Sequence, residues 1–265
     1  MHFEMKGREN APLIVLLGMP FCSMEPFRPL AEQLEEDCRV LLVTWDGHEQ
    51  KEITYTNARD QALQTLTWLR NGGERDIALI CGLSGGAKAA MELARMVSED
   101  RTMTLGHVLM DGFAFGHMCW LRRMLRLRVT RSLLKRARKG TQEEAVTRML
   151  GSRLVRLFVK EPTPYRPYLT DFVRVARNVS LKTTRRVVHD SCRCTLHEFP
   201  DRLSRRLVFM WSRREPAALA RRRVMSHYPL SMEQRMADPG TLGFLARHPA
   251  EYAQLLKGLA LMGDR

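Results

Sequence analysis

The sequence has no apolar run long enough to cross a membrane. A membrane-spanning helix needs about 18 consecutive apolar residues, and polar or charged residues interrupt every stretch well before that length. The amino-terminal residues include Glu4 and Glu9 and do not follow the pattern of a secretory signal before Pro12. Because 45% of the 265 residues are hydrophobic, the chain can nevertheless bury a core. We therefore expect a globular, cytoplasmic protein.

Cysteine is too sparse and too irregularly spaced for a disulfide framework or a structural zinc site. The six cysteines stand at positions 22, 38, 81, 119, 192 and 194. The closest pair, Cys192 and Cys194, is tighter than ordinary zinc-ligand spacing and has no second pair to complete a site. We predict reduced thiols, with Cys38 and Cys81 in the core, and neither a metal nor another cofactor.

Acidic residues are absent from one strongly basic segment. Lys and Arg number 43 against 29 Asp and Glu, giving a net charge of +14. Between Trp120 and Lys139 there is no acidic residue, and the cations are Arg122, Arg123, Arg126, Arg128, Arg131, Lys135, Arg136, Arg138 and Lys139. This pattern fits a solvated helix face, or docking to an acidic carrier protein, an anionic membrane surface or an anionic substrate. Nucleic acid is disfavoured, because no helix-turn-helix, zinc-finger or RNA-binding signature is present.

The most informative stretch that is present runs from Ile77 to Met91. An apolar run ending at Cys81 predicts a buried strand, and Gly82-Leu83-Ser84-Gly85-Gly86 fits the pattern G-x-S-x-G. A helical apolar periodicity follows directly. Strand, tight glycine turn and helix is the setting of a nucleophile elbow, in which Ser84 projects from the sheet and the helix amino terminus favours an oxyanion. The alternative interpretation is a glycine-rich turn that binds a phosphate or only packs.

Strand and helix patterns alternate along the first part of the chain, which predicts an α/β fold. Strands are expected at 13–17, 39–45, 77–81 and 107–111, with helices between them, so we predict a mostly parallel sheet flanked by helices.

The alternation then stops and resumes after about 90 residues. Residues 116–201 carry helical patterns only. They include a basic amphipathic helix with an apolar stripe at Met118, Leu121, Leu125 and Val129 or Leu133, a capping box at 141–144, and a further helix at 183–197. A strand at 207–211, a helix near 216–226, a strand near 232–236 and a final helix at 249–261 complete the chain. We therefore predict a core of residues 1–115 and 202–265, with 116–201 inserted as a helical cap.

With these residues placed, the chain resembles the α/β-hydrolase superfamily, in particular small bacterial hydrolases with a helical cap. The resemblance covers nearly the whole chain. It is carried by the elbow at 82–86, Gly18-Met19-Pro20 after the first buried strand, Asp46-Gly47-His48 after the second, and the segment 243–252 that contains His-Pro. It implies that Ser84 is the nucleophile and that the oxyanion donors are the backbone N–H groups of Gly85 and Met19.

The resemblance also implies an acid and a histidine. The acid is expected just past the strand at 207–211, where Glu215 stands; Asp111 is a second candidate and Asp238 a weaker one. In the turn where the family places its histidine, this chain reads Gly240-Thr241-Leu242-Gly243. His248 is therefore the histidine assigned to the triad. The remaining candidates are His227, His189, His197, His48 and His117.

Two functions follow from these residues. The first is a serine hydrolase of esterase or thioesterase type, acting on a small-molecule ester or acyl substrate through an acyl-Ser84 intermediate. The second is a catalytically degenerate protein of the same fold that keeps a ligand pocket but lacks a complete triad.

Overall fold

The computed structural model describes residues 1–50, 52–112, 115–159, 161–213, 215, 219–240 and 242–262, apart from the side chains of residues 154, 157 and 158. Thr241, which stands where a catalytic histidine was expected, lies outside the described residues.

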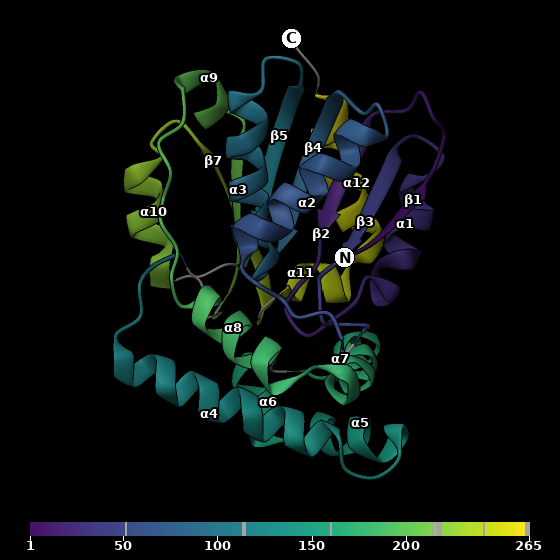
Figure 1. The fold of residues 1–265 in the computed structure, drawn as a ribbon, viewed down its shortest axis with the longest axis vertical. Coiled ribbons are helices and arrows are strands. Elements are labelled where there is room, and N and C mark those ends of the chain that lie inside the picture. Colours follow the sequence, from purple (N-terminus) through teal and green to yellow (C-terminus); the bar gives the residue numbers. More distant parts are fainter. Residues whose placement is uncertain are drawn as a thin grey trace.

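A seven-stranded sheet forms the centre of the molecule (Figure 1). Its spatial order is β1-β3-β2-β4-β5-β6-β7, and every neighbouring pair is parallel except β1 with β3. The strands are β1 (His2–Lys6), β2 (Leu13–Leu17), β3 (Arg39–Thr44), β4 (Asp76–Leu83), β5 (Thr104–Asp111), β6 (Leu207–Arg213) and β7 (Met232–Pro239). The strands β2 to β4 are continuous apolar runs because both faces of a parallel sheet are covered. The mostly parallel α/β fold predicted from the sequence is thus confirmed.

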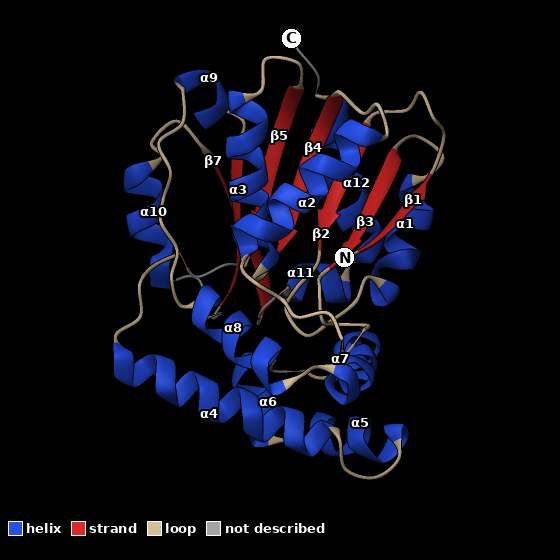
Figure 2. Ribbon diagram, viewed as in Figure 1, coloured by secondary structure: helices blue, strands red, loops and turns tan. Residues whose placement is uncertain are grey.

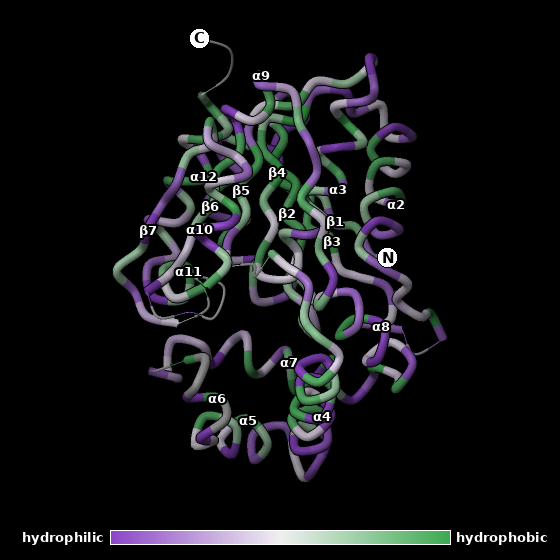
Figure 3. Tube along the Cα trace, turned by 90° about the vertical axis from the view of Figure 1, so that its left-hand side faces the viewer, coloured by the Kyte–Doolittle hydropathy of each residue, from purple (hydrophilic) through white to green (hydrophobic). Residues whose placement is uncertain are grey.

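Helices cover both faces of this sheet (Figure 2). One apolar cluster packs α2 (Ala58–Asn71), α3 (Gly86–Glu99), α9 (Asp201–Ser204) and α10 (Arg221–His227) against one face. A second cluster packs α1 (Arg28–Leu34), α11 (Gly243–Arg247) and α12 (Pro249–Leu261) against the other. Hydrophobic residues accordingly concentrate along the central strands, whereas hydrophilic residues colour much of the outer helices (Figure 3).

Between β5 and α9 in the chain, five helices of the described part gather beyond the ends of the strands (Figure 1). They are α4 (Trp120–Ala137), α5 (Gln142–Leu150), α6 (Arg153–Phe158), α7 (Arg166–Asn178) and α8 (Leu181–Ser191), and we call them the helical insertion. Short 3-10 helices, η1 (Glu25–Phe27) and η2 (Thr163–Tyr165), precede α1 and α7. The insertion has an apolar cluster of its own, which continues onto Phe21, Trp45 and Tyr55 of the sheet domain.

In the insertion, the local sequence signals predicted a helix start correctly, but they did not predict which faces of the helices are buried. The predicted capping box forms, since Thr141 Oγ1 accepts the Glu144 N–H at 3.3 Å and Glu144 Oε2 accepts the Thr141 N–H at 3.0 Å. The apolar stripe predicted for this segment faces inward only in part, since Met118 and Leu133 pack against the apolar cluster of the insertion. Leu121 and Leu125 are exposed, and Leu134 is among the residues that pack inward.

Two element boundaries differ from the sequence-based expectation. The helix expected at 183–197 is α8, which starts earlier and ends at Ser191. The helix expected at 216–226 begins at Arg221 within the described part of the chain. The polar amino terminus forms the edge strand β1, whose pairing with β3 satisfies its backbone groups. None of the helices in the described ranges is both long and apolar enough to span a bilayer.

Candidate functional site

Ser84 occupies a sharp turn between β4 and α3 and has a left-handed backbone conformation, with φ of 53°. Such a conformation costs a non-glycine residue about 1–3 kcal/mol and is characteristic of functional sites. Two neighbouring glycines are required by close backbone contacts. A Cβ on Gly82 would lie 2.5 Å from Ala87 Cα, and one on Gly86 would lie 2.2 Å from Leu17 O. The predicted elbow is therefore formed, and it presents a partly exposed Ser84.

The loop after β2 lies against this elbow. A Cβ on Gly85 would lie 2.4 Å from Pro20 Cγ, so only glycine permits the close approach of the two segments. Among the described residues, the backbone N–H groups of Met19 and Gly85 have no hydrogen-bond partner. Two free N–H groups beside a strained serine are the arrangement that stabilises an oxyanion.

His48 and Asp171 fix that loop from two sides. The Phe21 N–H donates to His48 Nε2 at 2.9 Å, and His48 Nδ1 lies 3.0 Å from Asp46 O. Asp171 of α7 accepts the Ser23 N–H at 2.6 Å and the Ser23 hydroxyl at 2.9 Å. Asp171 was not predicted, because a contact between residues so distant in the chain leaves no local pattern.

His48 is therefore a structural residue of the oxyanion loop. Since Nε2 accepts a hydrogen bond, the ring proton belongs on Nδ1, where it can be donated to the Asp46 carbonyl. Burial lowers the pKa of His48 to about 4, so the ring stays neutral at physiological pH. With both nitrogens engaged, His48 has no nitrogen available to accept the proton of Ser84.

Both acid candidates are buried at the carboxyl ends of neighbouring strands. Asp111 ends β5 and accepts the Tyr252 hydroxyl at 3.0 Å, and its backbone carbonyl accepts the Ser84 N–H at 2.6 Å. Glu215 follows β6 and accepts the Ser212 N–H at 2.8 Å. Burial raises the pKa of Asp111 to about 7. Burial, followed by the negative charge of Asp111, raises the pKa of Glu215 to about 8.

Unpaired polar atoms accumulate around these two acids. Within the described residues, four buried atoms in this region have no hydrogen-bond partner: Asp111 Oδ1, Glu215 Oε2, Tyr165 Oη and Arg247 Nη2. The Arg247 guanidinium stacks over the Tyr165 ring at 5.9 Å and donates to Pro239 O at 3.1 Å, at the end of β7. Buried polar groups are normally paired, so this group of atoms is suited to receive a polar ligand atom or a water.

His248 lies at the start of α12 and contacts two carboxylates. Its Nε2 is 3.3 Å from Asp238 Oδ1 and its Nδ1 is 3.3 Å from Glu251 Oε1. The pairing with Asp238, which belongs to β7, was not predicted.

The other histidines have contacts elsewhere. His197 lies 3.0 Å from Glu92 and His227 lies 3.6 Å from Glu198. His189 is on α8, and His117 forms an isolated bridge with Arg193. No hydrogen bond or ion pair in the described part of the chain joins a histidine to Ser84. The structure therefore brings together Ser84, the N–H groups of Met19 and Gly85 that the sequence proposed as donors, and Asp111, and it places no histidine of the described residues in contact with Ser84.

The arrangement of side chains in the described ranges also bears on metal binding. No group of three or more His, Cys, Asp or Glu side chains is placed there to hold a metal ion. All six cysteines are free, and burial raises the pKa of the Cys194 thiol to about 12.

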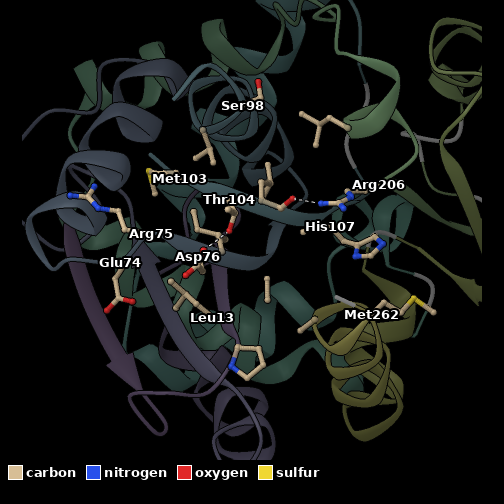
Figure 4. A pocket seen from close by; sticks show the side chains of 18 of the residues that line it. Leu13, Glu74, Arg75, Asp76, Ser98, Met103, Thr104, His107, Arg206 and Met262 are labelled. Atoms are coloured by element: carbon tan, nitrogen blue, oxygen red, sulfur yellow. Dashed lines mark hydrogen bonds between the residues drawn. The ribbon is translucent and has the colours of Figure 1, made fainter. Parts of the chain in front are cut away.

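A hollow of about 860 Å³ lies at the opposite end of the sheet (Figure 4). It is lined by residues at the amino ends of β4 and β5, including Asp76 and His107. The Thr104 hydroxyl donates to Asp76 at 2.6 Å, and Arg206 donates to Leu105 O at 2.7 Å. Ligands of open α/β sheets bind at the carboxyl ends of the strands, so this hollow is separate from the site around Ser84.

Comparisons with known proteins agree with this geometry. A model of the alpha/beta hydrolase family matches residues 14–255. Among curated proteins, none matches the sequence significantly.

Several solved structures share the fold at low sequence identity. An alpha/beta hydrolase family protein from Desulfitobacterium hafniense is 13% identical, with 97% of this chain and 99% of that chain covered and a TM-score of 0.74. A thermophilic esterase from Thermogutta terrifontis is 16% identical over 97% and 91% of the chains, with a TM-score of 0.66. The enol-lactonase from Burkholderia xenovorans is 16% identical over 98% and 96%, also with a TM-score of 0.66.

The family model spans the elbow, the oxyanion loop, the helical insertion and the segment with both buried acids. The chain therefore belongs to the alpha/beta hydrolase family.

Proposed function

We propose that this protein is a serine hydrolase that cleaves a carboxylic ester or thioester through an acyl-Ser84 intermediate. The observation that carries the proposal is the left-handed Ser84, with φ of 53°, beside the unpaired N–H groups of Met19 and Gly85. Backbone strain at a serine has no packing benefit of its own, and here it occurs at a turn where Ser84 stays partly exposed. Two of the structural neighbours are described as an esterase and an enol-lactonase, which is in keeping with this reaction class.

The reaction would proceed in two steps. Ser84 Oγ attacks the carbonyl carbon while its proton passes to a base, and the carbonyl oxygen becomes an oxyanion held by the Met19 and Gly85 N–H groups. Collapse expels the alcohol or thiol, which takes up the proton and leaves an acyl enzyme. Water then attacks that ester with the same proton transfers, releasing the carboxylic acid and free Ser84.

Two candidates for the base can be distinguished by experiment. One is His248, whose Nε2 lies 3.3 Å from Asp238 Oδ1. To act as the base, His248 would have to move into contact with Ser84. The other is Glu215, whose raised pKa of about 8 makes it a stronger proton acceptor than an ordinary glutamate. With Glu215 as the base, the acylation rate rises with pH to a midpoint near 8, and Glu215→Gln removes that rise. With His248 as the base, His248→Ala removes the activity and Glu215→Gln leaves the profile in place.

A fluorophosphonate probe tests the nucleophile directly. We expect the wild-type protein to be labelled and Ser84→Ala to remain unlabelled. The matched control is Ser98→Ala, because Ser98 is an exposed serine whose hydroxyl donates to Arg95 O at 2.7 Å. Folded wild-type protein that stays unlabelled, under conditions that fully label an ordinary serine hydrolase, would rule out the proposal.

The second candidate function is a ligand-binding protein without hydrolytic activity. The observation that favours it is that no described histidine contacts Ser84. Loss of the base from a triad lowers the rate by orders of magnitude. In that case an unlabelled wild-type protein would still show an upward shift of Tm with acyl ligands, and Ser84→Ala would show the same shift.

A further inference from the structure

The first turns of α4 expose large apolar side chains. Trp120 and Leu121 are each 69% exposed, Leu125 is 62% exposed and Met124 is 37% exposed. By contrast, Trp211 is only 3% exposed. Single exposed apolar residues are ordinary, but four within two helical turns form a contiguous patch of the kind that marks an interaction surface.

This patch points away from the rest of the protein. The opposite side of α4 carries its buried residues, Leu134 and Ala137, and the helix packs on α7 and α8. In Figure 1, α8 lies between α4 and the sheet, and α4 forms the outer boundary of the insertion. In the described ranges, nothing of this chain covers the apolar side of the helix.

All charged residues of the helix that carries the patch are cationic. Nine Lys or Arg and no acidic residue occur from Trp120 to Lys139. Arg122, Arg128 and Lys135 are exposed. The positions 120, 124, 128, 131 and 135 are separated by four, four, three and four residues, so they follow one face of an α-helix. This face of α4 is therefore one continuous stripe, apolar at Trp120 and Met124 and cationic from Arg128 to Lys135.

The cationic half borders a groove between α4 and the start of α8. The groove has a volume of about 450 Å³. It is lined by Arg131, Leu134, Lys135, Arg138, Lys139, Leu181 and Thr184. Leu181, at its edge, is 52% exposed. Arg138 already donates to the carbonyls of Ala176 and Val179. The other three cations, beside an apolar edge, suit a phosphate-bearing headgroup attached to an acyl chain.

We propose that α4 docks the protein on an anionic lipid surface. Trp120, Leu121 and Leu125 enter the interfacial layer, and the cationic stripe lies among the phosphates. Tryptophan and leucine on a helix rich in arginine are the composition of interfacial helices, and each basic residue near an anionic surface adds about 1 kcal/mol. This inference does not depend on the reaction at Ser84.

Charge and shape favour a lipid surface over other occupants. Pairing this face of α4 with that of a second copy would bring two helices rich in arginine and without acidic residues together, and like charges at an interface are unfavourable. A protruding helix presents a convex surface, so an acidic protein would need a matching groove. A deformable headgroup layer accepts a convex apolar surface directly.

Co-sedimentation with vesicles of phosphatidylcholine, with or without phosphatidylglycerol, tests the proposal. We expect binding only when phosphatidylglycerol is present. The triple variant Arg128→Glu, Arg131→Glu, Lys135→Glu should bind at least about a hundredfold more weakly, because each lost cation costs about fivefold. A matched control on another surface, Arg59→Glu with Arg101→Glu, should change binding much less.

Tryptophan emission then reports whether the apolar half inserts. Trp120 is exposed, whereas Trp45 and Trp211 are buried and Trp68 is half-buried, so a blue shift on vesicle binding should come from Trp120. We expect Trp120→Phe to abolish the shift, and Trp120→Ser with Leu125→Ser to weaken binding. Leu63→Ser on α2, where the side chain is 49% exposed, is the apolar control.

Several outcomes would overturn the proposal. They are equal binding to neutral and anionic vesicles, full binding by the triple charge variant, or an unchanged Trp120 emission on bound vesicles. Binding to an acidic protein with no binding to anionic vesicles would assign the surface to a protein partner instead. Circular dichroism and Tm of each variant establish that the substitutions leave the fold intact.

Discussion

The protonation of Glu215 should make the protein lose stability as the pH rises above neutrality. Burial raises the pKa of this carboxyl from an ordinary 4.5 to about 8 in the folded protein. Between these values the folded state holds a proton that the unfolded state has released. The free energy of unfolding therefore falls with increasing pH, and the contribution of the proton is lost as the pH passes the folded pKa.

The magnitude follows from the width of the window. Between pH 6.5 and 8 the difference is about one proton, and 1.5 pH units correspond to about 2 kcal/mol at 1.36 kcal/mol per unit. Asp111, whose folded pKa is about 7, adds up to about 1 kcal/mol over the same range. The lower limit of 6.5 leaves most of the titration of His48, which acts in the opposite direction, below the window.

Glu215→Gln is the informative variant. The glutamine carbonyl can still accept the Ser212 N–H, which Glu215 accepts at 2.8 Å, and the side chain can no longer ionise. We expect urea unfolding of the variant to give a free energy that depends less on pH, with about 2 kcal/mol less decrease between pH 6.5 and 8. Glu36→Gln, at an exposed glutamate, is the control and should follow the wild type. A wild-type stability that is constant or rises across this window would refute the reasoning, as would an equal slope in Glu215→Gln.

Two further predictions concern the elbow and its loop. Gly82→Ala should lower the free energy of unfolding by at least about 2 kcal/mol in urea titrations, because its Cβ would meet Ala87 Cα at 2.5 Å. The control is Gly258→Ala, where no atom lies within 4 Å of the added Cβ, and it should be neutral or slightly stabilising. Equal effects of the two substitutions would contradict the packing argument. His48→Gln should remove a pH dependence from the acid side. The folded pKa of His48 is about 4 against an ordinary 6.5, so the unfolded state binds the extra proton, and the contribution of His48 to stability falls by about 3 kcal/mol as the pH drops across that window. Unfolding measured from pH 4 to 6.5 should show this decrease in the wild type relative to the variant, and parallel curves would show that His48 does not stay neutral.

Features set by neighbouring residues could be predicted from the sequence. The elbow was predictable because a buried strand, three glycines and a helix all lie within a short stretch around Ser84. The capping box at Thr141 and the final helix from Pro249 to Leu261 are equally local and were predicted at the correct residues. The parallel sheet followed from the alternation of strand and helix patterns.

The arrangement around the elbow depended on contacts between distant parts of the chain. Asp171 reaches Ser23 across 148 positions and Tyr252 reaches Asp111 across 141, and neither contact leaves a pattern in the sequence. His48 was one of the candidate bases in the sequence. The structure removes it, because its two nitrogens contact the Phe21 N–H and the Asp46 carbonyl.

The sequence by itself determined the fold class, the elbow and the cationic character of α4, because each depends on composition or on residues within a few turns of one another. Only the tertiary structure decided which side of α4 is buried, that Leu121 faces outward, and that Asp111 and Glu215 are buried together. The physical reason is that burial is a property of the neighbours that a side chain acquires on folding. A periodic pattern specifies that a helix has two faces, but the packing of other elements determines which face meets the core.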